Sequence, residues 1–295
     1  MTAVLPLDHA LAVIGEVTAA HRLASETLAL TRCHGRVLAQ GVTGVPADGQ
    51  GFDPGALMTP ARVALAASLG IPALSVARKP TVAVFTVGDE LVEPGLPLAA
   101  GQRYDSNREL LMGLLRADGL EPTAWPRLPD DPRQIEIALR DAGCAFDLVV
   151  VCGSPSSGNQ PVADVVARFG EVHFHGVRME PGAQVLFGSL DEARLLGLSD
   201  DPIAVVATWL TLGRAVIDGL QGRIDPRPVL QARMAASIDK PHSQRAFLPA
   251  RIEPGNHGLR VDPHPLGLVE SNALVVVPEE SRHVPAGAIV DVLPL

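Results

Sequence analysis

The chain has very little lysine, few cysteines and no surplus of positive charge. Only Lys79 and Lys240 are lysines among its 24 basic residues, so chemistry that needs an ammonium group has two candidates. The three cysteines, Cys33, Cys144 and Cys152, lie far apart and form no CxxC pair. This usage excludes a disulfide framework and a zinc knuckle, and it is typical of a protein in the reducing cytoplasm.

The balance of charge and hydropathy excludes several further classes of protein. The net charge is −9, whereas binding to nucleic acid normally needs a basic face, so we expect no nucleic-acid partner. No apolar run reaches roughly 18 residues without a charge or a proline, so we expect no membrane-spanning helix. Hydrophobic residues make up 47% and charged residues 19%, which excludes a disordered chain. At roughly 150 residues per domain, the 295 residues make two domains or three small ones.

The middle of the chain, residues 76–222, alternates apolar runs with amphipathic stretches. TVAVFT (81–86) and LVVVC (148–152) have the continuous apolar character of buried strands. Helical periodicity follows over 107–118, 132–142, 161–169 and 202–219. This alternation predicts an α/β fold, in which a three-layer βαβ central domain contains a mostly parallel sheet.

The two flanking regions have different patterns. Residues 1–75 carry helical periodicity over 8–20 and a helix that opens at Thr59-Pro60, which predicts a small helical N-terminal region. Residues 223–295 are rich in proline and show short strand-like runs over 229–238, 246–252, 258–261, 273–277 and 289–293. These runs predict a small antiparallel β-barrel.

The loop after the first apolar strand carries the first candidate site. In parallel sheets, ligands bind beyond the carboxyl ends of the strands. Gly88-Asp89-Glu90 stands directly after TVAVFT, and two adjacent carboxylates can bind a divalent cation or position a polar substrate. The alternative is a solvated turn with two acidic residues on the surface.

Two more segments stand at the ends of strands or the starts of helices. Tyr104-Asp105-Ser106-Asn107 precedes a helix, and it is either a simple helix cap or an anion or hydroxyl site. The loop GSPSSG (153–158) follows the strand LVVVC, where glycines let backbone N–H groups approach an oxyanion. No lysine follows this loop, so it is not a Walker A motif.

These motifs, in this order and spacing, resemble those of the molybdopterin molybdenumtransferase family, the MoeA-type proteins and the E domain of gephyrin. The resemblance rests on VAVFTVGDEL (82–91), GQRYDSNRELL (101–111), DDPRQIEIAL (130–139), DLVVVCGSPSSG (147–158) and MEPG (179–182). It implies a cytoplasmic homodimer that inserts molybdate into adenylylated molybdopterin with the help of a divalent cation such as Mg²⁺.

The resemblance also implies site residues. Asp89 and Glu90 would be the catalytic residues and the metal ligands. The residues that would contact the molybdopterin ligand are Asp105, Ser106, Asn107, Gly153, Ser156, Gly158, Pro181, Gly182 and Pro202.

Several positions depart from the family pattern, and the departures fall on the loops expected to bind anions. There is no room near residues 46–52 for the β-domain that the family carries there. In GVRMEPGAQ (176–184), three lysines of the family pattern are replaced by Gly176, Glu180 and Ala183. The acidic residue after the glycine loop is replaced by Pro161, and GLSDDP (197–202) brings two carboxylates, in the segment Ser199–Asp201, into a loop that has none in the family.

Two hypotheses remain open for the function. In the first, the chain is a degenerate, non-catalytic or weakly active paralogue in molybdenum cofactor biosynthesis. It would act as a scaffold or regulator, with a full-length molybdenumtransferase or another maturation protein as its partner. In the second, it is an active transferase that inserts molybdate into adenylylated molybdopterin.

Overall fold

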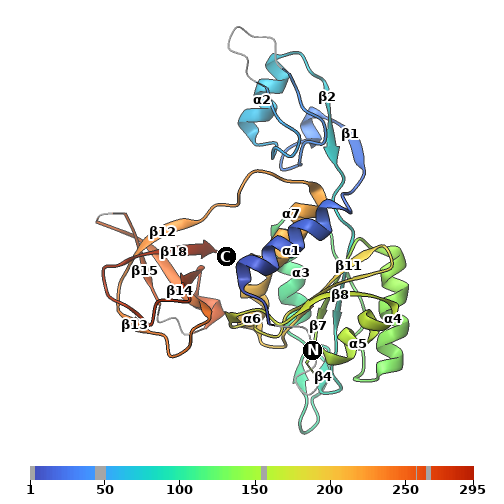
Figure 1. Ribbon diagram of the computed structural model, residues 1–295, viewed down its shortest axis with the longest axis vertical. Helices are drawn as coiled ribbons and strands as arrows, with labels where there is room; N and C mark the ends of the chain where they lie inside the picture. Colours follow the sequence, from blue (N-terminus) through green and yellow to red (C-terminus); the bar gives the residue numbers. More distant parts are fainter. Residues whose placement is uncertain (1–3, 44–50, 154–157, 257, 264–266) are drawn as a thin grey trace.

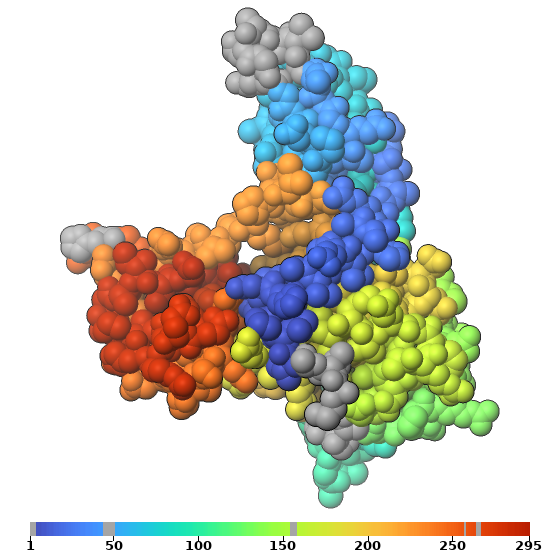
Figure 2. All heavy atoms as spheres, viewed as in Figure 1, coloured from blue at the N-terminus to red at the C-terminus, as the bar shows by residue number. Residues whose placement is uncertain are grey.

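The computed structural model describes residues 4–43, 51–153, 158–256, 258–263 and 267–295. Figures 1 and 2 show three bodies: a projecting lobe that contains β1 (Ser25–Ala29), α2 (Pro60–Ser68) and β2 (Ala73–Ala77), a central α/β domain, and a C-terminal barrel.

The central domain is built on a six-stranded sheet. In spatial order its strands are β6 (Thr123–Ala124), β3 (Val82–Thr86), β7 (Leu148–Cys152), β11 (Ala193–Leu198), β10 (Leu186–Leu190) and β8 (Gly170–His175). The first four strands are parallel, and β10 and β8 continue the sheet in antiparallel pairing. Every residue of β3 and β7 is buried, as expected of parallel strands covered on both faces.

Helices cover both faces of this sheet, so the expected three layers are confirmed. One face packs against α1 (Leu7–Ala19), α3 (Asn107–Ala117) and a long helical segment made of α6 (Pro202–Thr208), η2 (Trp209–Gly213) and α7 (Arg214–Gln221). The other face packs against α4 (Pro132–Ala145) and α5 (Gln160–Phe169). Successive residues of β7 alternate between the two cores, Val150 facing one and Val149 the other.

The N-terminal helix belongs in space to the central domain, because α1 packs on α7 (Figure 1). A Cβ atom on Gly219 would lie 2.0 Å from the Thr18 hydroxyl, so a glycine is needed where the two helices approach.

The rest of the N-terminal region forms the projecting lobe, in which short strands accompany the helix that the sequence predicted to open at Thr59-Pro60. It contains β1 (Ser25–Ala29), the short helix η1 (Leu30–Arg32), α2 (Pro60–Ser68) and β2 (Ala73–Ala77). The two strands pair in antiparallel fashion and enclose a small core with α2.

The C-terminal domain is a five-stranded barrel, but it is mixed rather than purely antiparallel. Around the barrel run β15 (Gly258–Asp262), β12 (Leu230–Met234), β18 (Ile289–Pro294), β16 (Ala273–Val277) and β14 (Arg245–Gly255), which pairs with β15 again. The β12–β15 pair is parallel. A closed ring with an odd number of strands cannot alternate direction throughout, so one parallel pair is unavoidable.

Short elements complete the chain. They are β4 (Leu91–Val92), β5 (Arg103–Tyr104), β9 (Met179–Glu180), β13 (Ile238–Asp239), η3 (Leu268–Glu270) and β17 (His283–Val284). The strand β9 pairs in parallel with β14, so the central domain contributes a strand to the edge of the barrel sheet.

The segment Pro202–Gln221 is long and apolar enough to cross a membrane by length and composition alone. In the structure, 67% of its most apolar window is buried inside the protein, as in the core helix of a domain, so the match is weak evidence for a membrane span.

Candidate functional site

The loops at the carboxyl ends of β3, β7 and β11 meet around a small cavity. Its volume is about 10 Å³, which is room for about one water molecule. The lining residues are Thr86, Leu91, Arg103, Tyr104, Asp105, Ser106, Asn107, Cys152, Gly153 and Asp200. Four of the residues expected at the site, Asp105, Ser106, Asn107 and Gly153, therefore lie together as the order of the motifs predicted.

Asp105 is a buried structural acid at the start of α3. It is 1% exposed, and its carboxylate accepts hydrogen bonds from the Thr86 hydroxyl at 2.6 Å and from the Arg108 backbone N–H at 3.2 Å. Ser106 occupies the N-cap position of α3 but makes no capping hydrogen bond with its side chain. Asp105 therefore satisfies one of the free N–H groups at this helix end, that of Arg108.

Asn107 connects α3 to the loop between β11 and α6. Its Nδ2 atom donates to the backbone carbonyl of Asp200 at 2.6 Å, and the residue is 8% exposed. Its Oδ1 atom is buried and has no hydrogen-bond partner among the described residues. Buried polar atoms are normally paired, so an unpaired acceptor beside a cavity points to a donor group on a ligand or a water molecule.

Arg103 supplies positive charge to the mouth of the cavity. Its Nη2 atom lies 3.3 Å from an Asp200 carboxylate oxygen and 3.5 Å from Glu90 Oε1. Glu90 Oε1 is itself buried without a hydrogen bond. The sequence reasoning missed both Arg103 and Thr86. A signal existed for each, because Thr86 ends a buried strand and Arg103 directly precedes the Tyr104–Asn107 motif.

Asp89 lies apart from this group. Its side chain is 73% exposed, its Oδ1 atom accepts the Asp130 backbone N–H at 3.3 Å, and it lies 4.0 Å from Arg127. The described part of the chain contains no group of three or more His, Cys, Asp and Glu side chains suited to a metal ion. Because Mg²⁺ is commonly held by one or two carboxylates together with water and substrate oxygens, the metal role of Asp89 and Glu90 stays a prediction.

The glycine loop after β7 is described only at its two ends, and Ser156 lies outside the described residues. The Gly153 N–H donates to the Leu198 carbonyl at 2.9 Å. A Cβ atom on Gly153 would lie 2.5 Å from the Gly158 carbonyl oxygen, so these two residues lie too close together for any residue other than glycine at position 153. Pro161 stands in the first turn of α5, where it has no backbone N–H to offer a ligand.

Pro181, Gly182 and Pro202 were expected at the site but are not among the residues that line the cavity. Gly182 packs against α6, where a Cβ atom would lie 2.5 Å from the Thr208 hydroxyl. Pro202 is the first residue of α6, and Asp201 caps this helix by accepting the Ala204 N–H at 2.9 Å. Gly182 therefore has a packing role, and Pro202 begins the helix that Asp201 caps.

The site is rich in carboxylates, and their negative charge affects the pKa of the buried Cys152 thiol. Complete burial, followed by the charges of Asp105 and Asp200, raises the pKa of Cys152 far above its usual value. A thiol in this state is not a nucleophile at neutral pH.

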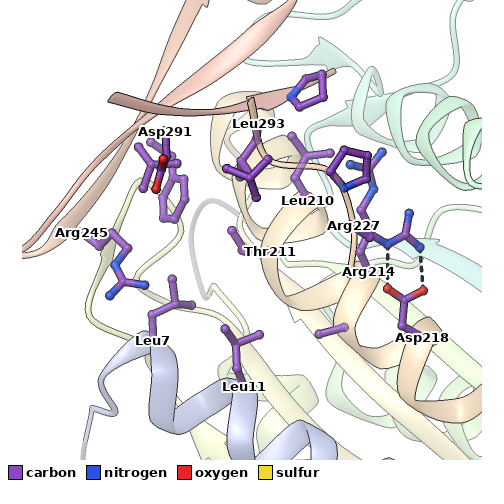
Figure 3. A pocket seen from close by; sticks show the side chains of 16 residues that line it. Leu7, Leu11, Leu210, Thr211, Arg214, Asp218, Arg227, Arg245, Asp291 and Leu293 are labelled. Carbon is purple, nitrogen blue, oxygen red and sulfur yellow. Dashed lines mark hydrogen bonds and ion pairs between the residues drawn. The ribbon is translucent and has the colours of Figure 1, made fainter. Parts of the chain in front are cut away.

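A second, larger cavity lies between α1, the long helix and the barrel (Figure 3). Its volume is about 390 Å³, and leucines such as Leu7, Leu11, Leu210 and Leu293 line it. The arginines on its rim are paired within the protein: Arg245 with Asp8, and Arg227 with Asp218. The cavity therefore lies between domains and is largely apolar, and the charges of these two arginines are already neutralised by carboxylates.

Comparisons with known proteins agree with this architecture. Residues 83–219 match the family described as a probable molybdopterin binding domain, and residues 231–295 match the C-terminal region (domain IV) of MoeA. Similar solved structures include a molybdopterin biosynthesis MoeA protein from Pyrococcus horikosii (TM-score 0.76, 20% identity, 99% of each chain). Another is a molybdenum cofactor biosynthesis protein from Pyrococcus furiosus (TM-score 0.76, 22% identity, 99% of this chain and 100% of that one).

Two curated relatives have higher identity. A molybdopterin molybdenumtransferase from Haemophilus influenzae is 31% identical over 254 residues, which cover 82% of this chain and 63% of the relative. A molybdopterin molybdenumtransferase 2 from Mycobacterium tuberculosis is 30% identical over 79% of this chain and 61% of the relative. The matches therefore span somewhat more than three fifths of these two relatives.

The fold and the matched regions define a protein with a molybdopterin-binding-type α/β domain joined to a MoeA-type C-terminal barrel. The chain belongs to the MoeA, or molybdopterin molybdenumtransferase, family.

Proposed function

We propose that this chain acts in molybdenum cofactor biosynthesis as a non-catalytic or weakly active member of its family, serving as a scaffold or regulator. The observation that carries the proposal is the state of the cavity at the carboxyl ends of the strands. Only about 10 Å³ is open there, and Arg103 at its mouth is held between two carboxylates.

Electrostatics supports this reading. Transfer of molybdate to a phosphorylated pterin brings anions together, so catalysis depends on fixed positive charge where that negative charge develops. Here Asp105 and Asp200 line the cavity, and Arg103 lies 3.3 Å from Asp200 and 3.5 Å from Glu90. Glu180 stands where the family pattern has a lysine, so the neighbouring loop adds a further negative charge.

Active transfer is the second candidate, and one observation favours it. Asp105 and Asn107 of the Tyr104–Asn107 motif still line the cavity, and the unpaired Asn107 Oδ1 atom is available to a ligand. In that case the ligand would have to displace the Asp200 loop before it could enter.

Partners and location extend the proposal. We expect a cytoplasmic homodimer that associates with a full-length molybdenumtransferase or another protein of cofactor maturation. This association can be tested by affinity capture, with the tagged, purified chain as bait and a lysate of cells that express a full-length family member. The association is supported if the wild-type chain captures the full-length protein and a variant with a destabilised barrel does not. It is contradicted if the folded wild-type chain captures no full-length protein.

Complementation tests the catalytic part. The chain is expressed in bacteria that lack the molybdenumtransferase, and nitrate reductase activity is measured at ordinary and at high molybdate. We expect no rescue at ordinary molybdate, with a full-length family member as the positive control. Rescue at ordinary molybdate by the wild-type chain, lost in Asp89→Ala, would overturn the proposal in favour of active transfer.

A further inference from the structure

We propose that Asp200 is a built-in competitor for the anion-binding group of the site: its carboxylate holds Arg103, which otherwise would bind an oxyanion of the ligand. This inference rests on the proposed function, because it takes the ligand to be an anionic molecule that enters at the carboxyl ends of the strands.

The geometry fastens the Asp200 loop across the mouth of the cavity at two points. The carboxylate of Asp200 lies 3.3 Å from Arg103 Nη2, at the start of β5. Its backbone carbonyl accepts the Asn107 Nδ2 hydrogen at 2.6 Å, from the first turn of α3. The loop between β11 and α6 is thereby tied to both elements that carry the Tyr104–Asn107 motif.

The ion pair between Arg103 and Asp200 is of a kind that can be broken. Arg103 is 43% exposed and Asp200 34%, and ion pairs this accessible to water contribute little to stability. The carboxylate at the mouth belongs to a loop residue rather than to a strand, so it can move without disturbing the sheet. An oxyanion that binds Arg103 would replace the Asp200 carboxylate and accept the charge-assisted hydrogen bond that Arg103 now donates to it.

A second observation points to a ligand at the same place. Asn107 is more than nine-tenths buried, lines the cavity and has an unpaired Oδ1 acceptor. Glu90 Oε1, 3.5 Å from Arg103 Nη2, is also buried and has no hydrogen bond to the part of the chain that the structure describes. The site therefore offers one cation and two acceptors, which fits an oxyanion attached to a group that carries N–H or O–H donors.

The experiment is a calorimetric titration of the full-length, folded chain with inorganic pyrophosphate and, separately, with molybdate at low ionic strength. The variant Asp200→Ala removes the competitor. We expect it to bind at least one of these anions about three- to fivefold more tightly than the wild-type chain does, because the anion no longer has to displace a weak, exposed ion pair.

Two further variants make the result specific. Asp201→Asn removes a charge one residue away but keeps an N-cap side chain on α6, so its affinity should stay within about twofold of wild type. In the double variant Asp200→Ala/Arg103→Gln, the gain should disappear because the cation has gone. Asp200→Asn, which keeps the shape of the loop residue, replaces Asp200→Ala if that variant does not fold.

The proposal is overturned if removing the Asp200 charge gives no gain, if Asp201→Asn gives the same gain, or if the gain survives Arg103→Gln. These outcomes differ from a failure of the proposed function. Rescue by the wild-type chain in the complementation assay would remove the non-catalytic role, while the comparison between Asp200 and Asp201 variants would still decide what Asp200 does.

Discussion

At the scale of single residues, Asp105 has two distinct tasks in the structure. It caps α3 through the Arg108 N–H, and it pairs with the Thr86 hydroxyl, which arrives from the end of β3. The sequence offered Asp105, Ser106 and Asn107 as equal candidates for the cap. Packing against β3 chose among them, because only Asp105 meets a buried hydroxyl as well as a free N–H group.

Replacing Asp105 with alanine should lower the free energy of unfolding by about 1–3 kcal/mol, because the buried Thr86 hydroxyl loses its acceptor. Urea denaturation followed by circular dichroism measures this change. Ser106→Ala is the matched control, and we expect it to change the free energy by less than about 0.5 kcal/mol because Ser106 makes no capping bond. Equal losses in both variants would show that the cap belongs to the segment rather than to Asp105.

At the scale of elements, the completely apolar strands were predictable and the strand with a buried charge was not. The predicted strands over 81–86 and 148–152 are β3 and β7. The sequence analysis had no strand at β11, although it lies at the centre of the sheet. Its residue Arg194 is 2% exposed, and a buried arginine hides the apolar run that marks a strand.

The starts of β3 and β7 are joined by an ion pair that should make stability depend on pH. Asp147 lies within 2.5 Å of both Arg78 Nη atoms and accepts the Thr81 N–H at 2.7 Å. Burial raises the pKa of Asp147, but the hydrogen bonds from Arg78 and Thr81 outweigh it and hold the pKa below its usual value.

The pair should therefore stabilise the fold above the pKa of an unfolded aspartate, about 3.9, and the gain should be lost as the pH falls through the lower folded pKa. Asp147→Asn should cost about 1–3 kcal/mol at pH 7 and much less below pH ~3. Urea unfolding at a series of pH values measures the free energy of unfolding of the wild-type chain and of Asp147→Asn. If the free energies of unfolding of the wild-type chain and Asp147→Asn differed by the same amount from pH 7 down to pH ~2, this linkage would be contradicted.

At the scale of the whole molecule, the projecting lobe is held by the linker between the central domain and the barrel. Asp225 of this linker accepts hydrogen bonds from both Arg62 Nη atoms and, at 2.6 Å, from the Leu57 backbone N–H. The Ile224 N–H donates to the Gly55 carbonyl at 2.9 Å. The lobe and the linker thus meet at this contact, close to where the lobe projects from the rest of the molecule (Figure 1).

Asp225→Ala should loosen this contact without unfolding the domains. We expect amide exchange at Leu57 and Ile224 to become roughly tenfold faster, which corresponds to about 1.4 kcal/mol of local opening free energy. Hydrogen exchange with mass spectrometry measures it, with β3 and β7 as internal references. Arg251→Ala, which breaks the exposed pair with Glu253 in the barrel, is the control and should leave both amides unchanged. Unchanged exchange in Asp225→Ala would mean that other contacts hold the lobe.

The sequence by itself determined the strand and helix alternation of the central domain, the short strands of the barrel and the family, because local periodicity and motif spacing are properties of consecutive residues. Only the tertiary structure decided which members of each motif meet. It brought Asp105, Asn107, Arg103 and Asp200 together, and it left Asp89 at the surface. It also decided the parallel closure of the barrel. These outcomes depend on contacts between residues far apart in the chain, whose hydrogen bonds and charges have no signature in any single segment.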